Sequence, residues 1–437
     1  MISREPALAA VPARPPVPGR PLNVSTGTAV VGGGVIGLSV AWELAQRGHR
    51  VAVVEGRAKP GSDESAADRA RDRSHPAAID PCTSWTAAGI LPPANFELAT
   101  DPLDRFRGFS HRLWPDWADR LKQASQVDTG LLACGGYYLA ETAGEAAAMM
   151  GMIDYWGELD IECRSLSRAD LLARQPVLSH WIENNPWLKK HPDRAAWWVP
   201  DEYQVRPPRL LRALRIACLR SGVQFLDRTS ITSIEDSPSS VKLYAGEAGS
   251  GQAEVARAQR VVLCGGAAAG TIDAAIGLQN SLIPVRGQIL LLQCHRFSEP
   301  AVLNIGNRYL VSRGDGHVLV GSCEEEAGFA QHTTESMIGQ LRSFAAQVFP
   351  PLADAPEVKR WAGLRPMTFD GFPMLGQVPG RKNVLVAAGH YRSGIHFSPA
   401  TAVAMADMIQ GTPPFMDLSA FSVSLDGGSP SQPRSGR

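Results

Sequence analysis

Apolar and polar positions along the chain follow two periods, and this pattern predicts strands and helices in alternation. Residues 28–31 form a short apolar run, which indicates a buried strand. The residues that follow place Leu38, Ala41 and Ala45 on one face of a helix. Residues 51–54 are a second apolar strand. A strand, a helix and a strand in this order are typical of an α/β fold with parallel strands.

The same alternation continues through the rest of the chain. Pro207 can open a helix, and residues 261–264 predict another apolar strand. Near the end, Ser398 can cap a helix that has Pro399 at its first position and closes at Gly411. Three segments between these helices are more strand-like and antiparallel in character, at residues 289–293, 308–312 and 317–321.

Three stretches lack an apolar period. Residues 1–27 are rich in Pro and Ala, and we expect them to be disordered. Residues 412–437 end in Ser, Pro, Gly and Arg, and we expect a loose tail. Residues 56–82 are polar and mixed in charge, which predicts a surface insertion. The 437 residues are enough for about two or three domains.

Charge and cysteine content narrow the class of protein. Basic and acidic residues number 43 each, so the net charge gives no reason to expect a nucleic acid partner. No apolar run approaches the roughly 18–20 residues of a membrane helix, so we expect no stable membrane association. The seven cysteines are odd in number and contain no C-x-x-C pair, which favours a reduced, cytoplasmic setting without a metal site. The oligomeric state stays open, a homo-oligomer included.

The most specific local pattern is a G-x-G-x-x-G that runs through Gly32, Gly33, Gly34, Val35, Ile36 and Gly37. It follows a predicted strand and opens a predicted helix, as in a dinucleotide-binding fold. Gly32 would allow the tight turn, Gly34 would let the backbone approach a pyrophosphate, and Gly37 would let helix and strand pack closely. The helix N-terminus offers N–H groups and a positive dipole end to phosphates.

Glu55 ends the second strand, about 20 residues after the glycines, where an acid binds the ribose in such folds. A carboxylate there can accept hydrogen bonds from ribose hydroxyls and disfavours a 2′-phosphate, so NADP is not expected. The pattern does not choose between FAD and NAD. A glycine-rich turn in an ordinary α/β protein is the alternative.

Four further segments resemble the D-amino acid oxidase superfamily and, within it, the glycine oxidases of thiamine biosynthesis. They are residues 84–91 (SWTAAGIL), residues 284–288 (PVRGQ), residues 309–316 (YLVSRGDG) with the acids that follow, and residues 363–395, which contain GLRP, DGFP and GHYRSGI. Their order and separations match the family from about residue 28 to residue 411.

This resemblance implies FAD rather than NAD and an α/β flavoprotein of two domains. The FAD-binding, Rossmann-like domain would comprise residues 28–110, 200–275 and 360–411. The substrate domain, built on a mostly antiparallel sheet, would comprise residues 111–199 and 276–359. The architecture would be that of D-amino acid oxidase and the type 2 glutathione reductase-like proteins.

The resemblance also implies roles for single residues. Arg365 and Arg392 would hold the carboxylate of the substrate, and Tyr309 would donate a hydrogen bond to it. The flavin would be contacted by Ser84, Ala88 and Gly89 of the first segment and by Gly389, Ser393, Gly394 and Ile395 of the last. Each of these three residues could have a role other than substrate binding. Arg365 could form a structural ion pair, Arg392 could contact FAD or backbone, and Tyr309 could be an ordinary packed strand residue.

These residue types suit the oxidation of an amino acid. A carboxylate taken out of water needs a matched cationic donor, and arginine supplies a planar fork that stays protonated. Oxidation of an amine by a flavin needs a neutral amine with its α-C–H bond directed at the flavin, so positioning is the main contribution of the protein. We therefore expect oxidation of glycine or another small amino acid by oxygen, with peroxide as a product, in the thiazole branch of thiamine biosynthesis.

Three other functions stay open. One is an oxidase of sarcosine, other N-methyl amino acids or D-amino acids, although no cysteine after Cys323 is present for the covalent flavin of monomeric sarcosine oxidases. Another is a D-amino acid dehydrogenase that passes electrons to a quinone. The third is a regulator that binds FAD or NAD without catalysis, but a regulator has no need of two arginines for a carboxylate. The absence of that cysteine predicts FAD held without a covalent bond.

Overall fold

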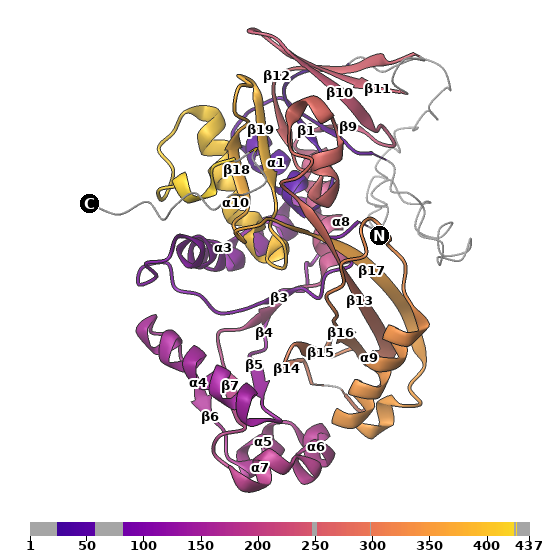
Figure 1. Cartoon of the computed structure of the whole chain (residues 1–437). Coiled ribbons are helices and arrows are strands. Elements are labelled where there is room, and N and C mark those ends of the chain that lie inside the picture. The colour runs from indigo at the N-terminus through magenta and orange to yellow at the C-terminus, as the bar shows by residue number, and fades with distance from the viewer. Residues whose placement is uncertain (1–23, 57–81, 247–250, 298, 424, 426–437) are drawn as a thin grey trace, which may run out of the picture.

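The structure is a computed structural model that describes residues 24–56, 82–246, 251–297, 299–423 and 425. The chain up to residue 23 and the predicted insertion, except for its end residues Gly56 and Cys82, lie outside the described residues. Two large sheets lie in different halves of the molecule (Figure 1). A small sheet lies between them and consists of β3 (Ile90–Leu91), β8 (Tyr203–Gln204) and β4 (Leu132–Ala133).

The first sheet carries the predicted nucleotide-binding elements. β1 (Val24–Val31) pairs in parallel with β2 (Val51–Val54) on one side and with β12 (Ala253–Leu263) on the other. The strand order is β10-β11-β12-β1-β2-β9, and β19 pairs with both β12 and β18. The remaining strands are β9 (Gln224–Leu226), β10 (Ile231–Asp236), β11 (Val241–Ala245), β18 (Met374–Gln377) and β19 (Val384–Ala388).

In the described part of the chain, four helices share one core with a face of this sheet: α1 (Val35–Gln46), α3 (Pro102–Ser125), α8 (Pro207–Arg220) and α10 (Gly394–Gln410). Val30 of β1 packs on this side with Leu38 of α1, whereas Ala29 and Val31 belong to the core on the opposite face. Successive side chains of a strand point to opposite faces, so a fully apolar strand needs cover on both sides. The predicted buried parallel strand is confirmed.

The second sheet has the strand order β17-β13-β16-β15-β14-β5-β7-β6. Its neighbouring strands are antiparallel, except that β14 and β5 are parallel. The strands are β5 (Gly136–Leu139), β6 (Arg164–Ser165), β7 (Ala196–Val199), β13 (Ile283–Gln293), β14 (Ala301–Ile305), β15 (Arg308–Ser312), β16 (His317–Gly321) and β17 (Glu357–Met367). The predicted α/β fold with a second, mostly antiparallel sheet is confirmed.

Among the residues that the structure describes, five helices accompany the second sheet. α9 (Glu335–Val348) packs on β13 and β16. The others are α4 (Ala143–Glu158), α5 (Arg168–Arg174), α6 (Ser179–Asn184) and α7 (Pro186–Lys190), which lie around β5, β6 and β7 (Figure 1). The core of this half is continuous from α9 to α6, because Leu341 and Trp181 belong to the same buried cluster.

Two of the expected domain boundaries differ from the packing. A boundary at residue 110 would cut α3, whose residues Trp114, Trp117 and Leu121 are buried in the core of the first sheet. The helix is continuous and its apolar face is turned toward α8 and α10, so it belongs there as a whole. A boundary at residue 360 would cut β17, which pairs along its length with β13 in the second sheet.

Helix α10 begins at Gly394, four residues before the predicted cap at Ser398. Pro399 therefore lies inside the helix, where it has no N–H to donate. The Ser398 hydroxyl donates to the carbonyl of Ile395 at 2.9 Å. Ser110 of α3 donates to the carbonyl of His396 at 2.6 Å and accepts from the N–H of Ala400 at 3.2 Å. Side chains thus satisfy the backbone groups around the proline.

Both expected loose ends are shorter than predicted. β1 starts at Val24 rather than residue 28, because residues 24–26 pair with residues 256–258 of β12. At the other end, Phe421 is 1% exposed and packs 4.9 Å from the ring of Phe106, so the described part of the tail folds back onto the core. All seven cysteines are free. Within residues 24–425, as far as they are described, no helix is both long and apolar enough to span a membrane.

Candidate functional site

The glycine-rich turn joins β1 to α1 by very close backbone packing. Gly32 has a φ of 114°, and a Cβ on it would lie 2.5 Å from the carbonyl oxygen of Cys264, next to β12. Gly37 lies under the turn, since a Cβ there would come within 1.9 Å of the Gly32 carbonyl oxygen. Gly34 is the N-cap residue and has no side chain to bond the first N–H groups of α1. The positive end of the helix dipole faces the cavity, where it would favour an anion, although the Ser84 hydroxyl accepts the N–H of Val35.

Glu55 and Ser84 tie this turn to its neighbours. The Glu55 carboxylate accepts a hydrogen bond from the N–H of Gly33. The Ser84 hydroxyl accepts one from the N–H of Val35 at 3.1 Å, across 49 positions in the sequence. A Cβ on Gly34 would lie 3.3 Å from the same hydroxyl. Two segments that the sequence analysis predicted to bind cofactor are therefore in direct contact.

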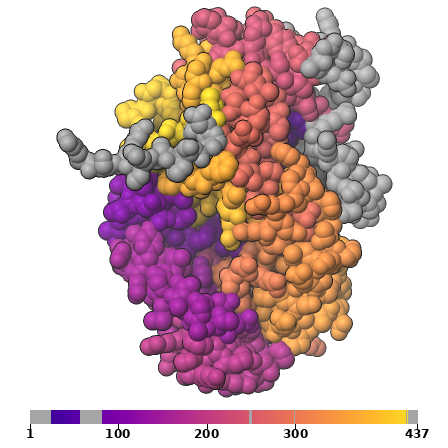
Figure 2. All heavy atoms as spheres, in the orientation of Figure 1, coloured from indigo at the N-terminus to yellow at the C-terminus, as the bar shows by residue number. Residues whose placement is uncertain are grey.

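A cavity of about 1250 Å³ runs from this turn to the second sheet. Figure 2 shows a recess between the magenta and the orange parts of the surface, which belong to the two sides of the second sheet. Fourteen of the predicted site residues line the cavity: Gly32, Gly34, Val35, Ile36, Glu55, Ser84, Ala88, Gly89, Tyr309, Arg365, Arg392, Ser393, Gly394 and Ile395. Gly37 and Gly389 lie behind its wall.

Arg365 reaches the cavity from β17 by crossing Gly287 of β13. A Cβ on Gly287 would lie 2.4 Å from Nη2 of Arg365, so the glycine provides the passage. Nη1 donates to the carbonyl of Cys323 at 2.8 Å, and Nη2 donates to the hydroxyl of Ser322 at 2.5 Å. These acceptors are uncharged, so they orient the guanidinium and leave its charge available to an anion. The ion-pair alternative for Arg365 has no support in these contacts.

Tyr309 lies directly opposite Gly321 in the pairing of β15 with β16. A Cβ on Gly321 would lie 2.4 Å from Cζ of the tyrosine, so the ring covers the glycine. Burial raises the pKa of Tyr309, while a hydrogen bond to Ser322 and the charges of Arg365 and Arg392 oppose that rise. The phenol is therefore neutral at physiological pH and has an O–H to donate.

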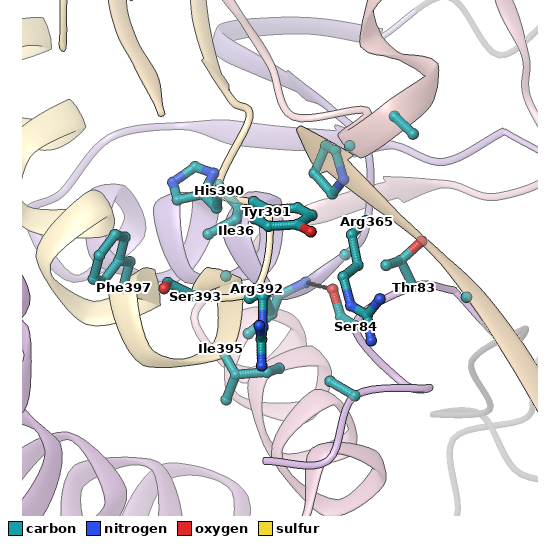
Figure 3. A pocket seen from close by; sticks show the side chains of 18 of the residues that line it. Ile36, Thr83, Ser84, Arg365, His390, Tyr391, Arg392, Ser393, Ile395 and Phe397 are labelled. Atoms are coloured by element: carbon teal, nitrogen blue, oxygen red, sulfur yellow. Dashed lines mark hydrogen bonds between the residues drawn. The ribbon is translucent and has the colours of Figure 1, made fainter. Parts of the chain in front are cut away.

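Arg392 belongs to the loop that leads into α10. The N–H of Tyr391 donates to the carbonyl of Pro366 at 2.9 Å, which holds this loop against β17. Figure 3 shows Arg365 and Arg392 extending in the same direction from these two neighbouring segments. Nη1 of Arg392 lies 3.2 Å from Oε1 of Glu324. The structure thus brings both arginines and Tyr309 to one end of the cavity.

His390 and Gly389 make contacts that support the fold around the start of α10. Nε2 of His390 lies 3.0 Å from the hydroxyl of Thr401 on α10, and burial lowers the pKa of the histidine to about 3. The ring is therefore neutral, as expected for a structural histidine. Gly389 has a φ of 84°, and a Cβ there would lie 2.5 Å from Cγ2 of Thr368. Its position supports the turn before α10 and does not face the cavity.

Comparison with known proteins shows the family of the chain. The model of the family described as FAD dependent oxidoreductase matches residues 28–408. This chain belongs to that family.

Proteins that resemble the chain include two glycine oxidases. The glycine oxidase of Geobacillus kaustophilus is 30% identical over 396 residues, which cover 90% of this chain and 96% of the relative. The glycine oxidase of Pseudomonas putida has the same identity and coverage. The crystal structure of glycine oxidase from Geobacillus kaustophilus superposes with a TM-score of 0.77 at 28% identity, and the match covers 92% of this chain and 99% of that chain. The protein is an FAD-dependent amino acid oxidoreductase.

The residues of the chain fit FAD. The N-terminus of α1 at Gly34 lines the cavity and would hold the pyrophosphate, and Glu55 lies where a ribose would follow. The loop with Ala88 and the start of α10 at Gly394 line the same cavity and would flank the flavin ring. A second helix N-terminus, that of α10, therefore also points at the cofactor cavity.

Sequence reasoning missed several residues of the site. Three groups line the cavity beside the predicted turn: residues 229–231 after β9, residues 264–268 after β12, and Thr271 with Ile272. The pair Gly265 and Gly266, directly after an apolar strand, was a signal that could have been used.

Arg313 was also missed, although it lies within residues 309–316, which resemble the family. Its Nη2 donates to the carbonyl of Ala88 at 2.6 Å, and its Nη1 donates to the side chain of Gln204 at 2.9 Å. Burial lowers the pKa of Arg313 to about 10, so it still carries a proton. It positions the loop that the resemblance assigns to the flavin.

Proposed function

We propose that the protein oxidises glycine or another small amino acid to the imine, which water converts to the 2-oxo acid and ammonia, and that oxygen is reduced to hydrogen peroxide. The observation that carries the proposal is the position of the Arg365 guanidinium in the cavity. The guanidinium lines the cavity, it is oriented by the uncharged acceptors of Ser322 and Cys323, and the same cavity continues to the dinucleotide turn at Gly32.

The chain would contribute binding and orientation. Arg365 would pair with the substrate carboxylate, Tyr309 would donate its O–H to the same group, and Arg392 would approach from the loop before α10. FAD, when bound, supplies the acceptor of a hydride. A carboxylate fixed at two or three points places the α-carbon in one position, which is where such enzymes gain most of their rate. Cavity walls such as Ile289 and Ile395 would exclude water.

The glycine oxidases that resemble the chain support glycine as a substrate and oxygen as the acceptor. The resemblance of the four quoted segments to the glycine oxidases of thiamine biosynthesis favours a role in the thiazole branch of that pathway. The seven free cysteines favour a reducing, cytoplasmic setting for the enzyme.

The test begins with the purified yellow holoprotein. Under anaerobic conditions we expect glycine to bleach the visible flavin band, and oxygen to restore it with formation of peroxide. Sarcosine and D-alanine in separate samples compare the other substrates of the superfamily. Acid precipitation should release intact FAD into the supernatant. If no amino acid bleaches the flavin, the proposal is wrong, and if bleaching occurs but oxygen restores the band only slowly, the acceptor is not oxygen.

A further inference from the structure

Three residues that are cross-strand partners form a row across the second sheet. The row leads away from the end of the cavity where Arg365 would bind the substrate carboxylate. Tyr138 on β5 lies opposite Asn304 on β14. Asn304 in turn lies opposite Tyr309 on β15. Residues in such a row point to one face of the sheet, and all three line the cavity. The ring of Tyr309 covers Gly321 on β16 and so leans toward Arg365. Asn304 and Tyr138 form the cavity wall on the side of Tyr309 that is away from Arg365.

Behind this wall lies a buried carboxyl group that the catalytic scheme does not use. Glu202 is 0% exposed and also lines the cavity. Its carboxyl accepts hydrogen bonds from the Tyr138 hydroxyl and, at 3.2 Å, from Nδ2 of Asn304. Gly136 makes room for it, since a Cβ there would lie 2.4 Å from Oε1 of Glu202. Both donors are uncharged, and burial raises the pKa of Glu202 to about 7. Near neutral pH the carboxyl is therefore close to its pKa, and a cation bound at this end of the cavity would stabilise its ionised form.

We propose that Glu202, Asn304 and Tyr138 form a distal subsite that takes the cationic end of an amino acid longer than glycine, of the ornithine class. The inference rests on the proposed function, because it requires the substrate carboxylate at Arg365. The Nδ2 group of Asn304 is used by Glu202, so its carbonyl oxygen is directed away from Glu202 and can accept from a substrate ammonium. Glu202 behind it adds to the attraction in its ionised form, which a bound ammonium favours.

The spacing of the strands gives the length of the ligand. Arg365 is held at the end of β16. The distance from β16 to β14 and β5 is two to three inter-strand spacings, roughly 10–14 Å. Two hydrogen bonds of about 2.9 Å leave roughly 4–8 Å for the ligand itself. An extended chain of about four to six bonds of 1.5 Å covers that span. Glycine is too short to reach the distal subsite.

The distal end of the cavity is aromatic as well as polar, which suits an aliphatic chain with a positive tip. The ring of Tyr138 packs edge-on against Trp156 at 5.3 Å, and both line the cavity. Arg107 also lines the cavity, but its guanidinium is paired with Asp104, so it does not neutralise Glu202. An anionic tip would be repelled by ionised Glu202, and an apolar tip would supply no positive charge to the carboxyl beyond the uncharged donors Tyr138 and Asn304.

The experiment uses ligands that bind without being oxidised. δ-Aminovalerate carries a carboxylate and a distal ammonium, and valerate carries the carboxylate alone. Each is titrated into the oxidised holoenzyme, and its dissociation constant is read from the change in the visible flavin spectrum. We expect δ-aminovalerate to bind at least about tenfold more tightly, as hydrogen bonds to a charged group provide. The Glu202→Gln variant should lose this preference. The Glu158→Gln variant, which removes an exposed charge on α4, should keep it.

The outcomes separate the subsite from the proposed function. Equal binding of the two ligands by the wild-type protein would overturn the distal subsite and leave the carboxylate clamp intact. A preference that survives in Glu202→Gln would also overturn it. If neither ligand perturbs the flavin, the clamp itself fails and the inference fails with it. If ornithine bleaches the flavin anaerobically faster than norvaline does, the result would support the subsite in turnover. This comparison uses only the wild-type protein, so it does not depend on the folding of a variant.

Discussion

Nη1 of Arg392 lies 3.2 Å from Oε1 of Glu324, so the arginine that is proposed to hold the substrate carboxylate already holds a carboxylate of its own chain. The two side chains are 55% and 48% exposed. An ion pair this exposed contributes only about 0.2–1 kcal/mol. A substrate can therefore displace Glu324 from Arg392, but it must compete for the guanidinium.

This competition predicts the behaviour of the Glu324→Gln variant. Removal of the charge should free Arg392 and lower the KM for an amino acid substrate by up to about fivefold, the equivalent of about 1 kcal/mol. The value of kcat should change little, because the α-carbon is still placed by Arg365. Steady-state peroxide production gives both constants. Glu326→Gln removes an exposed charge two residues away and serves as the control. Equal effects of the two substitutions would show that Glu324 does not compete for Arg392.

Glu55 is the residue on which cofactor affinity is expected to depend. It lines the cavity and accepts a hydrogen bond from the N–H of Gly33, so it combines the proposed ribose contact with support of the turn. The Glu55→Gln variant should bind FAD more weakly by roughly 1–3 kcal/mol, or about five- to 160-fold in Kd. Fluorescence titration of the apoprotein with FAD measures this, and thermal unfolding of the apoprotein reports whether the turn itself is damaged. An unchanged Kd would remove Glu55 from the ribose site.

His390 makes stability depend on pH. Burial lowers its pKa to about 3, below the value of about 6.5 expected in the unfolded chain. The unfolded state therefore binds more protons between these values, and the contribution is lost as the pH falls through that window. From neutral pH to pH 5, His390 should cost about 2 kcal/mol of the free energy of unfolding.

Urea unfolding at pH 7 and pH 5 measures this cost. The His390→Gln variant should lose less stability on acidification than the wild type, and its amide can still meet the Thr401 hydroxyl. His180→Gln, at an exposed histidine on α6, should behave as the wild type does. Identical pH dependence in all three proteins would mean that His390 is protonated without penalty in the folded state.

The sequence predicted the elements whose signals are local. The turn from β1 to α1 follows from Gly32, Gly34 and Gly37; a Cβ on Gly32 or Gly37 would meet backbone atoms, and a Cβ on Gly34 would meet the Ser84 hydroxyl at 3.3 Å. The strands at residues 289–293, 308–312 and 317–321 are apolar enough to be found alone, and they pair as antiparallel neighbours. The meeting of Arg365 with Arg392 was available only from the resemblance, since no local rule relates the two residues.

The remaining features depend on contacts between distant segments. The start of α10 was misplaced because Pro399 is normal at a first position and unusual inside a helix. It is tolerated here because Ser110, 290 positions from Ala400, bonds the freed backbone groups. Glu202 could not be found either, because a glutamate between two polar neighbours reads as a surface residue until the fold buries it against Tyr138.

Arg365 carries the functional assignment, and its replacement by Ala should leave FAD bound while it cripples the oxidation of amino acids. The loss of one partner from a buried, hydrogen-bonded charge pair costs on the order of 2–5 kcal/mol. That corresponds to a decrease in kcat/KM of about thirty- to several-thousand-fold. Steady-state peroxide production with glycine measures it. Flavin content and Tm show whether loss of the contacts to Ser322 and Cys323 disturbs the fold.

Comparison of substrates with and without a carboxylate distinguishes the loss of a carboxylate contact from a general loss of activity in Arg365→Ala. A simple alkyl amine has no carboxylate, so the wild type should oxidise it poorly and Arg365→Ala should lose little more. Arg365→Lys should recover part of the activity on glycine, because an ammonium keeps the charge but cannot hold Ser322, Cys323 and a carboxylate with one planar fork. Equal losses for glycine and the alkyl amine would place the function of Arg365 in the cofactor site or in the fold. In that case the carboxylate, and with it the amino acid, would have to bind at Arg392.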